Sequence, residues 1–136
     1  MPDAPEPDEA YRIDVEVTTP VLPTEVRSRV ERAVTALFPG AEVEDRDGTV
    51  VGRTHAMDHF AERLREQAIV DTARDVFLGS VAGDAFAFDL KKQPAHEGVV
   101  TFAVGRPDEL GEVHVHVRVD EPSVEAFVDR LAPRTA

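Results

Sequence analysis

The apolar residues between positions 57 and 77 change their helical phase halfway along, and this change most constrains how the chain can fold. At about 100° per residue, the first apolar group forms one narrow stripe of a helix; it consists of Met57, Phe60, Ala61, Leu64 and Ala68. The second group forms a stripe rotated by roughly 150° from the first; it consists of Ile69, Val70, Ala73, Val76 and Phe77. One straight helix would therefore have to bury opposite faces along its two halves.

A break near residues 68–70 resolves this conflict, because each half can then turn its own stripe toward the core. The segment 65–75 contains neither Gly nor Pro, the residues that most often end helices. We predict a second helix that is capped by Asp71 or a near neighbour and closed by Gly79. The alternative is a continuous helix sandwiched between two layers. In either arrangement, four polar residues lie on or beside the junction: Arg65, Gln67, Asp71 and Arg74.

Alternation of apolar and polar residues predicts β-strands on both sides of this helical region. The clearest alternation is EVHVHVRVD at 112–120, where valines alternate with two histidines and an arginine. The dipeptide Asp47-Gly48 supplies the positive φ angles of a tight hairpin turn. Strands are predicted at 11–18, 84–91, 99–104 and 112–120, and as a hairpin pair within 41–54.

Two further helices are indicated by apolar residues at helical spacing, one between Thr24 and Pro39 and one from Pro122 to Leu131. Because helices and strands alternate irregularly, with a hairpin among them, the pattern favours an α+β fold over a doubly wound parallel sheet. We predict a single two-layer domain over 11–136, with about six strands in a mostly antiparallel or mixed sheet packed against about four helices. Residues 1–10 are predicted to be a disordered acidic tail.

Charge is the most unusual property of the composition. The 136 residues include 27 Asp and Glu but only 15 Lys and Arg, which gives a formal net charge of −12. Only Lys91 and Lys92 are lysines. This balance resembles that of proteins from salt-loving archaea, whereas an ordinary acidic protein would explain the charge but not the scarcity of lysine. Such a surface repels nucleic acids and anionic membranes at long range in dilute salt.

Several classes of protein are disfavoured by what the chain lacks. It has no cysteine, so a disulfide framework is excluded and any metal site would need His and carboxylate ligands. Residues 1–10 have no basic region and no apolar core, so no signal peptide or membrane anchor is predicted there. No apolar run approaches the length of a membrane span. We expect a soluble cytoplasmic protein with no membrane partner.

Two pairs of histidines are weak candidates for a metal site. His55 and His59 are four residues apart and could bind a metal ion with one further ligand, and His114 and His116 share one side of a strand. A helix start and an open polar strand face are the commoner explanations, so we predict no metal and no cofactor. No nucleophile, glycine loop or carboxylate pair has diagnostic spacing, so we predict no catalytic residues and no enzyme activity.

Residues 52–102 read GRTHAMDHFAERLREQAIVDTARDVFLGSVAGDAFAFDLKKQPAHEGVVTF. This segment resembles the central signature of an archaeal family, the uncharacterised protein family 0201, in which a segment like R-x-Q-x-I-x-D-T-A-R is followed by a strand that ends in N-K-Q-A. The earlier segment 23–44, PTEVRSRVERAVTALFPGAEVE, is also similar to the family. The resemblance therefore covers most of residues 11–120.

The resemblance implies a fold like that of the ribosomal protein that grips the 5S RNA of the large subunit. It also implies a label of RNA binding and no established catalytic activity. Two positions depart from the family pattern, because Lys91 stands where the family usually has Asn and Pro94 where it usually has Ala. The family's polar motif residues fall on Arg65, Gln67, Asp71, Thr72, Arg74, Lys92 and Gln93.

Basic residues in the middle of the chain are the candidate nucleic-acid-binding site. Arginine suits bidentate phosphate contacts, and Gln67 and Gln93 could read base edges or sugar hydroxyls. Asp71 and Thr72 complete the predicted set. Alternatively, the basic residues are scattered, solvated charges that pair with neighbouring acids. If the hairpin, the helix pair and the end of strand 84–91 converge, the patch contains Arg53, Arg63, Arg65, Arg74, Lys91 and Lys92.

Three functional classes remain. The predicted function is non-catalytic recognition of structured RNA through this patch, because the chain shows no aromatic-rich platform for single strands. One alternative is a protein-interaction or scaffolding module, including a homodimer formed through an uncovered sheet face or edge. The other is a small-molecule-binding protein or enzyme that uses the same motif residues. A deep pocket beside Gln67, Arg74 and Lys92 would favour this last class.

Overall fold

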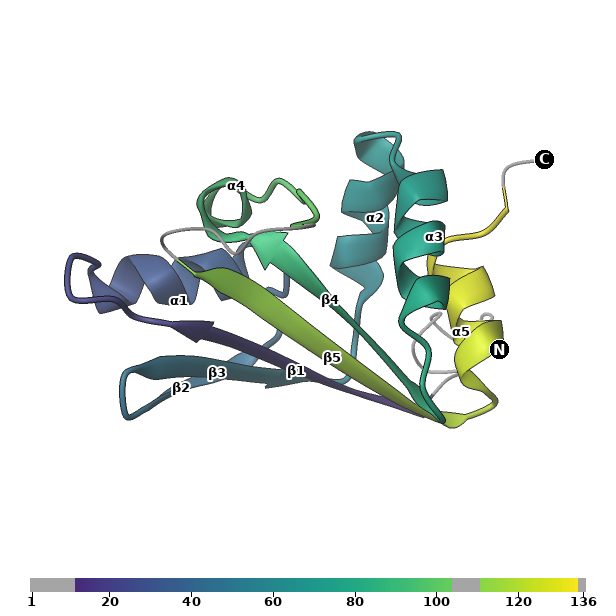
Figure 1. Ribbon diagram of the computed structural model, residues 1–136, viewed down its shortest axis with the longest axis horizontal. Helices are drawn as coiled ribbons and strands as arrows, with labels where there is room; N and C mark the ends of the chain where they lie inside the picture. Colours follow the sequence, from purple (N-terminus) through teal and green to yellow (C-terminus); the bar gives the residue numbers. More distant parts are fainter. Residues whose placement is uncertain (1–11, 104–110, 135–136) are drawn as a thin grey trace, which may run out of the picture.

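Five antiparallel strands form an open sheet, and helices cover one of its faces (Figure 1). The computed structural model describes residues 12–103 and 111–134. The strands in these ranges are β1 (Arg12–Pro20), β2 (Glu42–Arg46), β3 (Thr49–Thr54), β4 (Ala85–Lys91) and β5 (Glu112–Glu121). The helices are α1 (Arg27–Thr35), α2 (Asp58–Glu66), α3 (Val70–Gly79), α4 (Lys92–His96) and α5 (Val124–Leu131). The strand order is β2-β3-β1-β5-β4, and each of these pairings is antiparallel.

The alternation along the strands explains why helices cover only one face. The four valines of β5 are buried, whereas the His and Arg residues between them are exposed. In β1, Ile13, Val15 and Val17 are buried in the same way. An antiparallel sheet with one apolar face needs cover on that side alone. The predicted α+β class and the strand at 112–120 are thereby confirmed.

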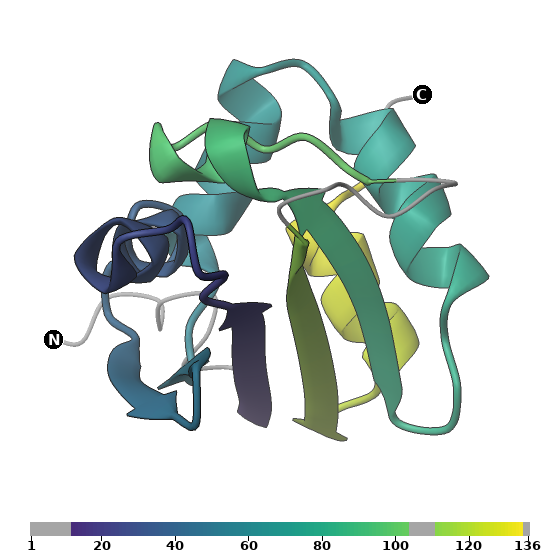
Figure 2. The ribbon, with the colours of Figure 1, turned by 60° about the vertical axis from the view of Figure 1, so that its left-hand side comes forward.

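Phenylalanine rings fill the space between β4 and the two helices α2 and α3. The ring centroid of Phe77 lies 5.0 Å from that of Phe86 and 4.9 Å from that of Phe88. Phe60 of α2 lies 5.4 Å from Phe88 by the same measure. Such ring pairs stabilise a core beyond the burial of their area. Figure 2 shows α2 and α3 standing over the sheet, with α4 next to α1.

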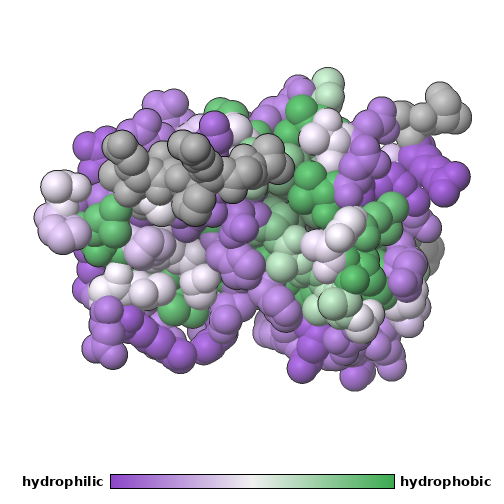
Figure 3. All heavy atoms as spheres, viewed as in Figure 1, coloured by the Kyte–Doolittle hydropathy of each residue, from purple (hydrophilic) through white to green (hydrophobic). Residues whose placement is uncertain are grey.

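The molecular face seen in Figure 3 is mostly hydrophilic, and apolar side chains reach it mainly around α3. Leu78 of α3 is 40% exposed. None of the helices in the described ranges is long and apolar enough to cross a membrane.

The predicted break between two helices is confirmed. The first helix, α2, ends at Glu66, the second, α3, begins at Val70, and Ala68 between them has a φ of 56°. This left-handed conformation is unfavourable for a residue with a Cβ. It lets each helix direct its own stripe to the core, with Phe60 buried from α2 and Phe77 buried from α3. The alternative of one continuous helix is therefore wrong.

The predicted cap of the second helix is wrong, although the helix ends where we expected. Ile69 occupies the N-cap position and makes no side-chain cap bond, while Asp71 lies in the first turn of α3. A carboxylate in the first turn still interacts favourably with the positive end of the helix dipole. The helix ends at Gly79, but this glycine does not adopt the left-handed conformation that we expected of the cap.

The predicted hairpin turn is confirmed at Asp47-Gly48. The two residues have φ angles of 51° and 83°. Positive φ angles at both central positions are what a tight two-residue hairpin requires. The Gly48 N–H also donates to Oδ1 of Asp45 at 3.2 Å. Strands β2 and β3 pair on either side of this turn.

The described residues form five strands and five helices rather than about six and four. In the predicted strand at 99–104, Phe102 makes only an isolated bridge with Leu90, and position 104 lies outside the described residues. The additional helix, α4, was not predicted, because a five-residue helix is too short to show a helical period. The predicted tail at 1–10 lies outside the described residues.

Gly52 of β3 faces α1, and we predict that a side chain at this position destabilises the fold. A Cβ there would lie 2.8 Å from Cγ1 of Val34, which is buried in α1. We expect Gly52→Ala to lower the free energy of unfolding in urea by about 1–3 kcal/mol, the usual effect of overpacking. Gly79→Ala is the matched control, because apart from its chain neighbours and its own helix backbone no described atom comes within 4 Å of a Cβ there. Equal losses in the two variants would contradict close packing of α1 on β3.

Candidate functional site

A groove of about 780 Å³ lies between α1 and α4. Its lining comes from α1, from the residues just before it and from the segment 92–101. Two lining residues are exposed valines, with Val26 at 59% and Val99 at 41% exposure. Arg29, Gln93 and His96 also line the groove. The groove therefore combines apolar surface with hydrogen-bonding groups, as ligand-binding sites commonly do.

Lys92, at the start of α4, bonds to residues that precede α1 on the other side of the groove. Its Nζ donates to the carbonyl oxygen of Pro20 at 2.7 Å and to Oε1 of Glu25 at 2.9 Å. The same Glu25 oxygen accepts the N–H of Leu22 at 2.9 Å. The side chains of Lys92 and Glu25 are only 5% and 13% exposed. A buried ion pair requires such additional hydrogen bonds, so this lysine and its partners hold the two walls of the groove together.

Gln67 fixes the segment that follows α4. Its Nε2 donates to the carbonyl oxygen of Val100 at 2.8 Å, and the N–H of Val100 donates back to Oε1 of Gln67 at 2.8 Å. This pair of bonds satisfies both backbone groups of a buried residue. The junction between α2 and α3 is thereby joined to the groove wall that carries Val99.

Three of the motif residues therefore converge on one segment of the chain, residues 92–101. Gln67 and Lys92 hold this segment from its two ends, and the exposed Gln93 lines the groove. Gln67 lies 33 positions before its partner Val100. The glutamine that we expected to read RNA bases instead bonds to the protein backbone in this structure.

Arg74 lies away from the groove and joins α3 to the C-terminal helix α5. Its side chain is 13% exposed and pairs with Asp129 at 2.7 Å. Its Nη1 also donates to the carbonyl oxygen of Ala132 at 3.1 Å. The side chain of Arg74 therefore contacts α5 and the residue that follows it.

The other predicted residues of the helix junction differ in their surroundings. Arg63 pairs with Glu66 one turn later, and its Nε is buried without a hydrogen-bond partner in the described structure. Arg65, Asp71 and Thr72 are exposed. These three side chains form the accessible part of the junction.

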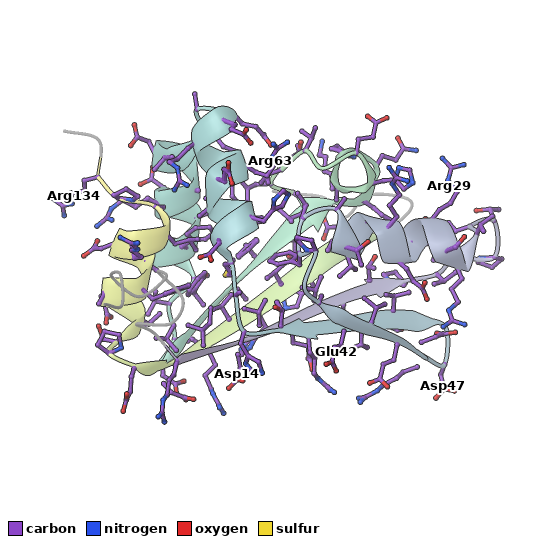
Figure 4. The ribbon with its side chains drawn as sticks, turned by 180° about the vertical axis from the view of Figure 1, so that it is seen from behind. Asp14, Arg29, Glu42, Asp47, Arg63 and Arg134 are labelled. Atoms are coloured by element: carbon purple, nitrogen blue, oxygen red, sulfur yellow. The ribbon has the colours of Figure 1, made fainter. Side chains whose placement is uncertain are left out.

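The predicted basic patch required the hairpin, the helix pair and the end of strand 84–91 to converge, and the structure places Arg53 of the hairpin on a different face from Arg63. Arg53 is exposed on the open face of the sheet, where it pairs with Glu16 at 3.2 Å and with Glu44 at 3.7 Å. Lys91 is exposed at the end of β4. Figure 4 shows the two sides, with Asp14 pointing from the sheet away from the helices and Arg29 and Arg63 on the helical side. Strand alternation sends Arg53 to the face that no helix covers.

Carboxylates neutralise other arginines of the open sheet face. Arg46 pairs with Glu44 at 2.7 Å. Arg118 pairs with Asp14 at 2.7 Å and with Asp120 at 3.3 Å. The charges of Asp120 and Asp14 raise the pKa of Arg118 above its usual value. Because these pairs are exposed they add little stability, but they cancel positive charge on this face.

Two histidines of this side, His55 and His114, also lie against carboxylates. His114 Nδ1 is 2.7 Å from Oδ1 of Asp89. His55 Nδ1 is 2.9 Å from the carbonyl oxygen of Ile13 and 3.1 Å from Oδ1 of Asp14. Within residues 12–103 and 111–134, no three His, Asp or Glu side chains gather where they could hold a metal ion.

The chain is similar to proteins from several archaea. A UPF0200/UPF0201 protein of Archaeoglobus fulgidus is 35% identical over 93% of this chain, which spans only 39% of that relative. A UPF0201 protein of Thermococcus onnurineus is 36% identical, with coverage of 90% of this chain and 93% of the relative. No protein-family model matches the chain.

A solved structure of a UPF0201 protein is also similar to this chain. The crystal structure of the UPF0201 protein from Methanococcus jannaschii has a TM-score of 0.84 and 32% identity to this chain, and the match covers 90% of this chain and 95% of the other. This chain shares its fold with that protein, and its sequence identity to the UPF0201 proteins extends over 90% of the chain. The chain belongs to the UPF0201 family.

The sequence did not point to several residues that shape the groove. Glu25 lies 67 positions before Lys92, and no local pattern marks it as the partner of that lysine. Val26 and Arg29 were part of an ordinary amphipathic helix pattern. Val99 was placed in a strand, so its exposure was not expected. No local pattern distinguishes Val26 and Val99 from other apolar residues, because their exposure is a property of the folded chain.

The pair formed by Lys92 and Glu25 leads to a prediction about stability. Lys92→Met leaves the Glu25 carboxylate buried without its cation, so we expect urea denaturation to show a loss of about 3–5 kcal/mol. Lys92→Met combined with Glu25→Gln should recover part of this loss, because no unpaired charge remains. Lys91→Met, at the exposed neighbouring position, is the control and should change stability by less than about 0.5 kcal/mol. The same loss in both lysine variants would rule out a special role for Lys92.

Proposed function

We propose that this UPF0201 protein binds structured RNA through its helical side, with the groove between α1 and α4 at the centre of the contact. One difference between the arginines carries the proposal. Arg29 is exposed at the groove and has no carboxylate partner among the described residues, whereas Arg53 and Arg118 on the sheet face are each paired with carboxylates. A guanidinium that no carboxylate occupies is available to bind a phosphate through two parallel hydrogen bonds.

Several other polar groups of the groove suit the same ligand, although the exposed carboxylate of Glu97 also lines the groove. The amide of Gln93 and the hydroxyls of Thr24 and Thr101 can exchange hydrogen bonds with base edges and 2′-hydroxyls. Among the described residues, none that lines the groove is Phe, Tyr or Trp. A single-stranded RNA that needs an aromatic stacking platform is therefore a poorer match than a folded RNA recognised by shape and backbone.

The family resemblance supports this proposal in two ways. It implies a label of RNA binding, and it implies a fold like that of the ribosomal protein that grips 5S RNA. Both remain implications of the resemblance. Together with the groove they favour recognition of RNA without catalysis.

The net charge of −12 repels RNA at long range. We therefore propose that the protein binds RNA at high salt concentration. At an ionic strength of about 1 M the Debye length is about 3 Å, and repulsion between distant charges is screened. Only direct contacts such as that of Arg29 then contribute. The scarcity of lysine, which resembles the composition of halophilic archaeal proteins, supports such a saline environment.

RNA binding is tested by fluorescence anisotropy at several KCl concentrations, with a folded hairpin and a single strand of equal length. We expect the hairpin to bind more tightly at high salt, and we expect Arg29→Ala to weaken its binding about tenfold through loss of one charge-assisted contact. Arg130→Ala removes the same charge from the exposed surface of α5 and should leave the affinity unchanged. If both RNAs bind with equal affinity and high salt abolishes the binding of both, the interaction is nonspecific electrostatic attraction and the proposal is wrong.

The size of the groove supports one second candidate, a small anionic ligand. Its volume of about 780 Å³ lies within the range of small-molecule sites. The two candidates are distinguished by calorimetric titration with a mononucleotide such as AMP. If AMP binds as tightly as the hairpin and Arg29→Ala abolishes both, the small ligand and not the RNA is what the groove recognises.

The saline environment predicts that stability rises with salt. Screening relieves repulsion among the excess carboxylates, so we expect the melting temperature to increase by about 3–4 °C for each kcal/mol gained. Circular dichroism between about 0.1 M and about 2 M KCl measures this change, because the Debye length falls steeply over that range. An uncharged osmolyte at equal osmolality serves as the control for solute exclusion. A melting temperature that stays constant or falls with KCl would contradict adaptation to high salt.

A further inference from the structure

We propose that the groove between α1 and α4 takes one unpaired nucleotide that projects from a structured RNA, such as a bulged nucleotide. The inference rests on the proposed RNA-binding function and adds which feature of an RNA the protein selects. A groove of about 780 Å³ has the size of a small-ligand site and not that of a surface for a double helix. A single nucleotide fits this size.

The apolar lining of the groove is the first argument. Among the described residues, three large apolar side chains are exposed, namely Val26, Leu78 and Val99. Two of these three, Val26 and Val99, line this one groove and approach it from the α1 side and the α4 side. Burial of apolar surface is favourable, and a base offers two flat apolar faces. In a double helix those faces are stacked on neighbouring bases, so only an unpaired base can present them.

The polar lining supplies partners for the rest of the nucleotide. A buried base edge requires hydrogen bonds, and the amide of Gln93 can both donate and accept. Arg29 lies on the same groove and can bind the adjoining phosphate. The groove therefore offers apolar contact, an edge-reading amide and a cation within one site.

The groove is held in shape by the protein itself. The wall that carries Val99 is fixed by the two bonds between Gln67 and Val100, and the N–H of Val99 donates to the carbonyl oxygen of Pro94 at 2.9 Å. The buried Lys92 anchors the same wall at its other end. A site that is already ordered loses less conformational entropy when it binds. Gln67 thus supports the groove without lining it.

The test compares two RNA hairpins in molar KCl with the unaltered full chain. One hairpin carries a single bulged 2-aminopurine, a fluorescent analogue of adenine, and the other is fully paired and has the same number of phosphates. We expect the bulged hairpin to bind about tenfold tighter, because burial of the apolar surface of the base against Val26 and Val99 is favourable. We also expect the fluorescence of 2-aminopurine to rise when the base leaves its neighbours in the helix and enters the groove.

Two matched variants locate the effect. Val99→Asp and Leu78→Asp place the same charge at positions of nearly equal exposure, 41% and 40%, but only Val99 lines the groove. We expect Val99→Asp to abolish the preference for the bulged hairpin, and we expect Leu78→Asp to retain it. Circular dichroism shows whether each variant is folded. The fluorescence of 2-aminopurine is measured with the unaltered protein, so it tests the inference even if a variant does not fold.

Each other outcome overturns a stated part of the inference. Equal affinity of the unaltered protein for the two hairpins would overturn selection of an unpaired nucleotide and leave the proposed RNA binding intact. A preference for the bulge that survives Val99→Asp would overturn its placement in this groove. Binding of neither hairpin above background would overturn both this inference and the proposed function.

Discussion

The sheet has one apolar face and one polar face, and the rest of the structure depends on this constraint. The valines of β5 and the apolar residues of β1 and β4 all need cover on the same side. The helices therefore share one layer (Figure 1), and neighbouring helices must each direct an apolar stripe toward the same face. The left-handed conformation of Ala68 meets this demand where the chain passes from α2 to α3.

The same constraint separates the charges of the protein into two environments. On the open sheet face, the alternation of the strands brings acids and bases close together, and Arg53 and Arg118 are paired with carboxylates there. On the helical side, Arg29 projects next to the groove with no carboxylate at its guanidinium among the described residues. A protein with a net charge of −12 thus keeps Arg29, which pairs with no described carboxylate, beside a groove that also exposes Val26 and Val99.

The polar motif residues of the family divide into supporting and accessible side chains. Gln67, Arg74 and Lys92 bond to backbone carbonyls or carboxylates of the protein, so in this structure they hold α4 and α5 in place. Gln93 is exposed at the groove that two of these residues stabilise. Gln67 and Lys92, which lie on different elements, therefore shape one groove although Gln67 does not line it.

The sequence by itself determined the α+β class, the hairpin at Asp47-Gly48 and the break near Ala68, because these depend on short-range periods and on local backbone preferences. It also identified the chain segment that carries the groove wall, through the motif around Lys92. Only the tertiary structure decided what that segment contacts. The bonds of Gln67, Arg74 and Lys92 join residues 33, 58 and 67 positions apart. No local pattern records such distant partners, because they meet only when the helices pack on the covered face of the sheet.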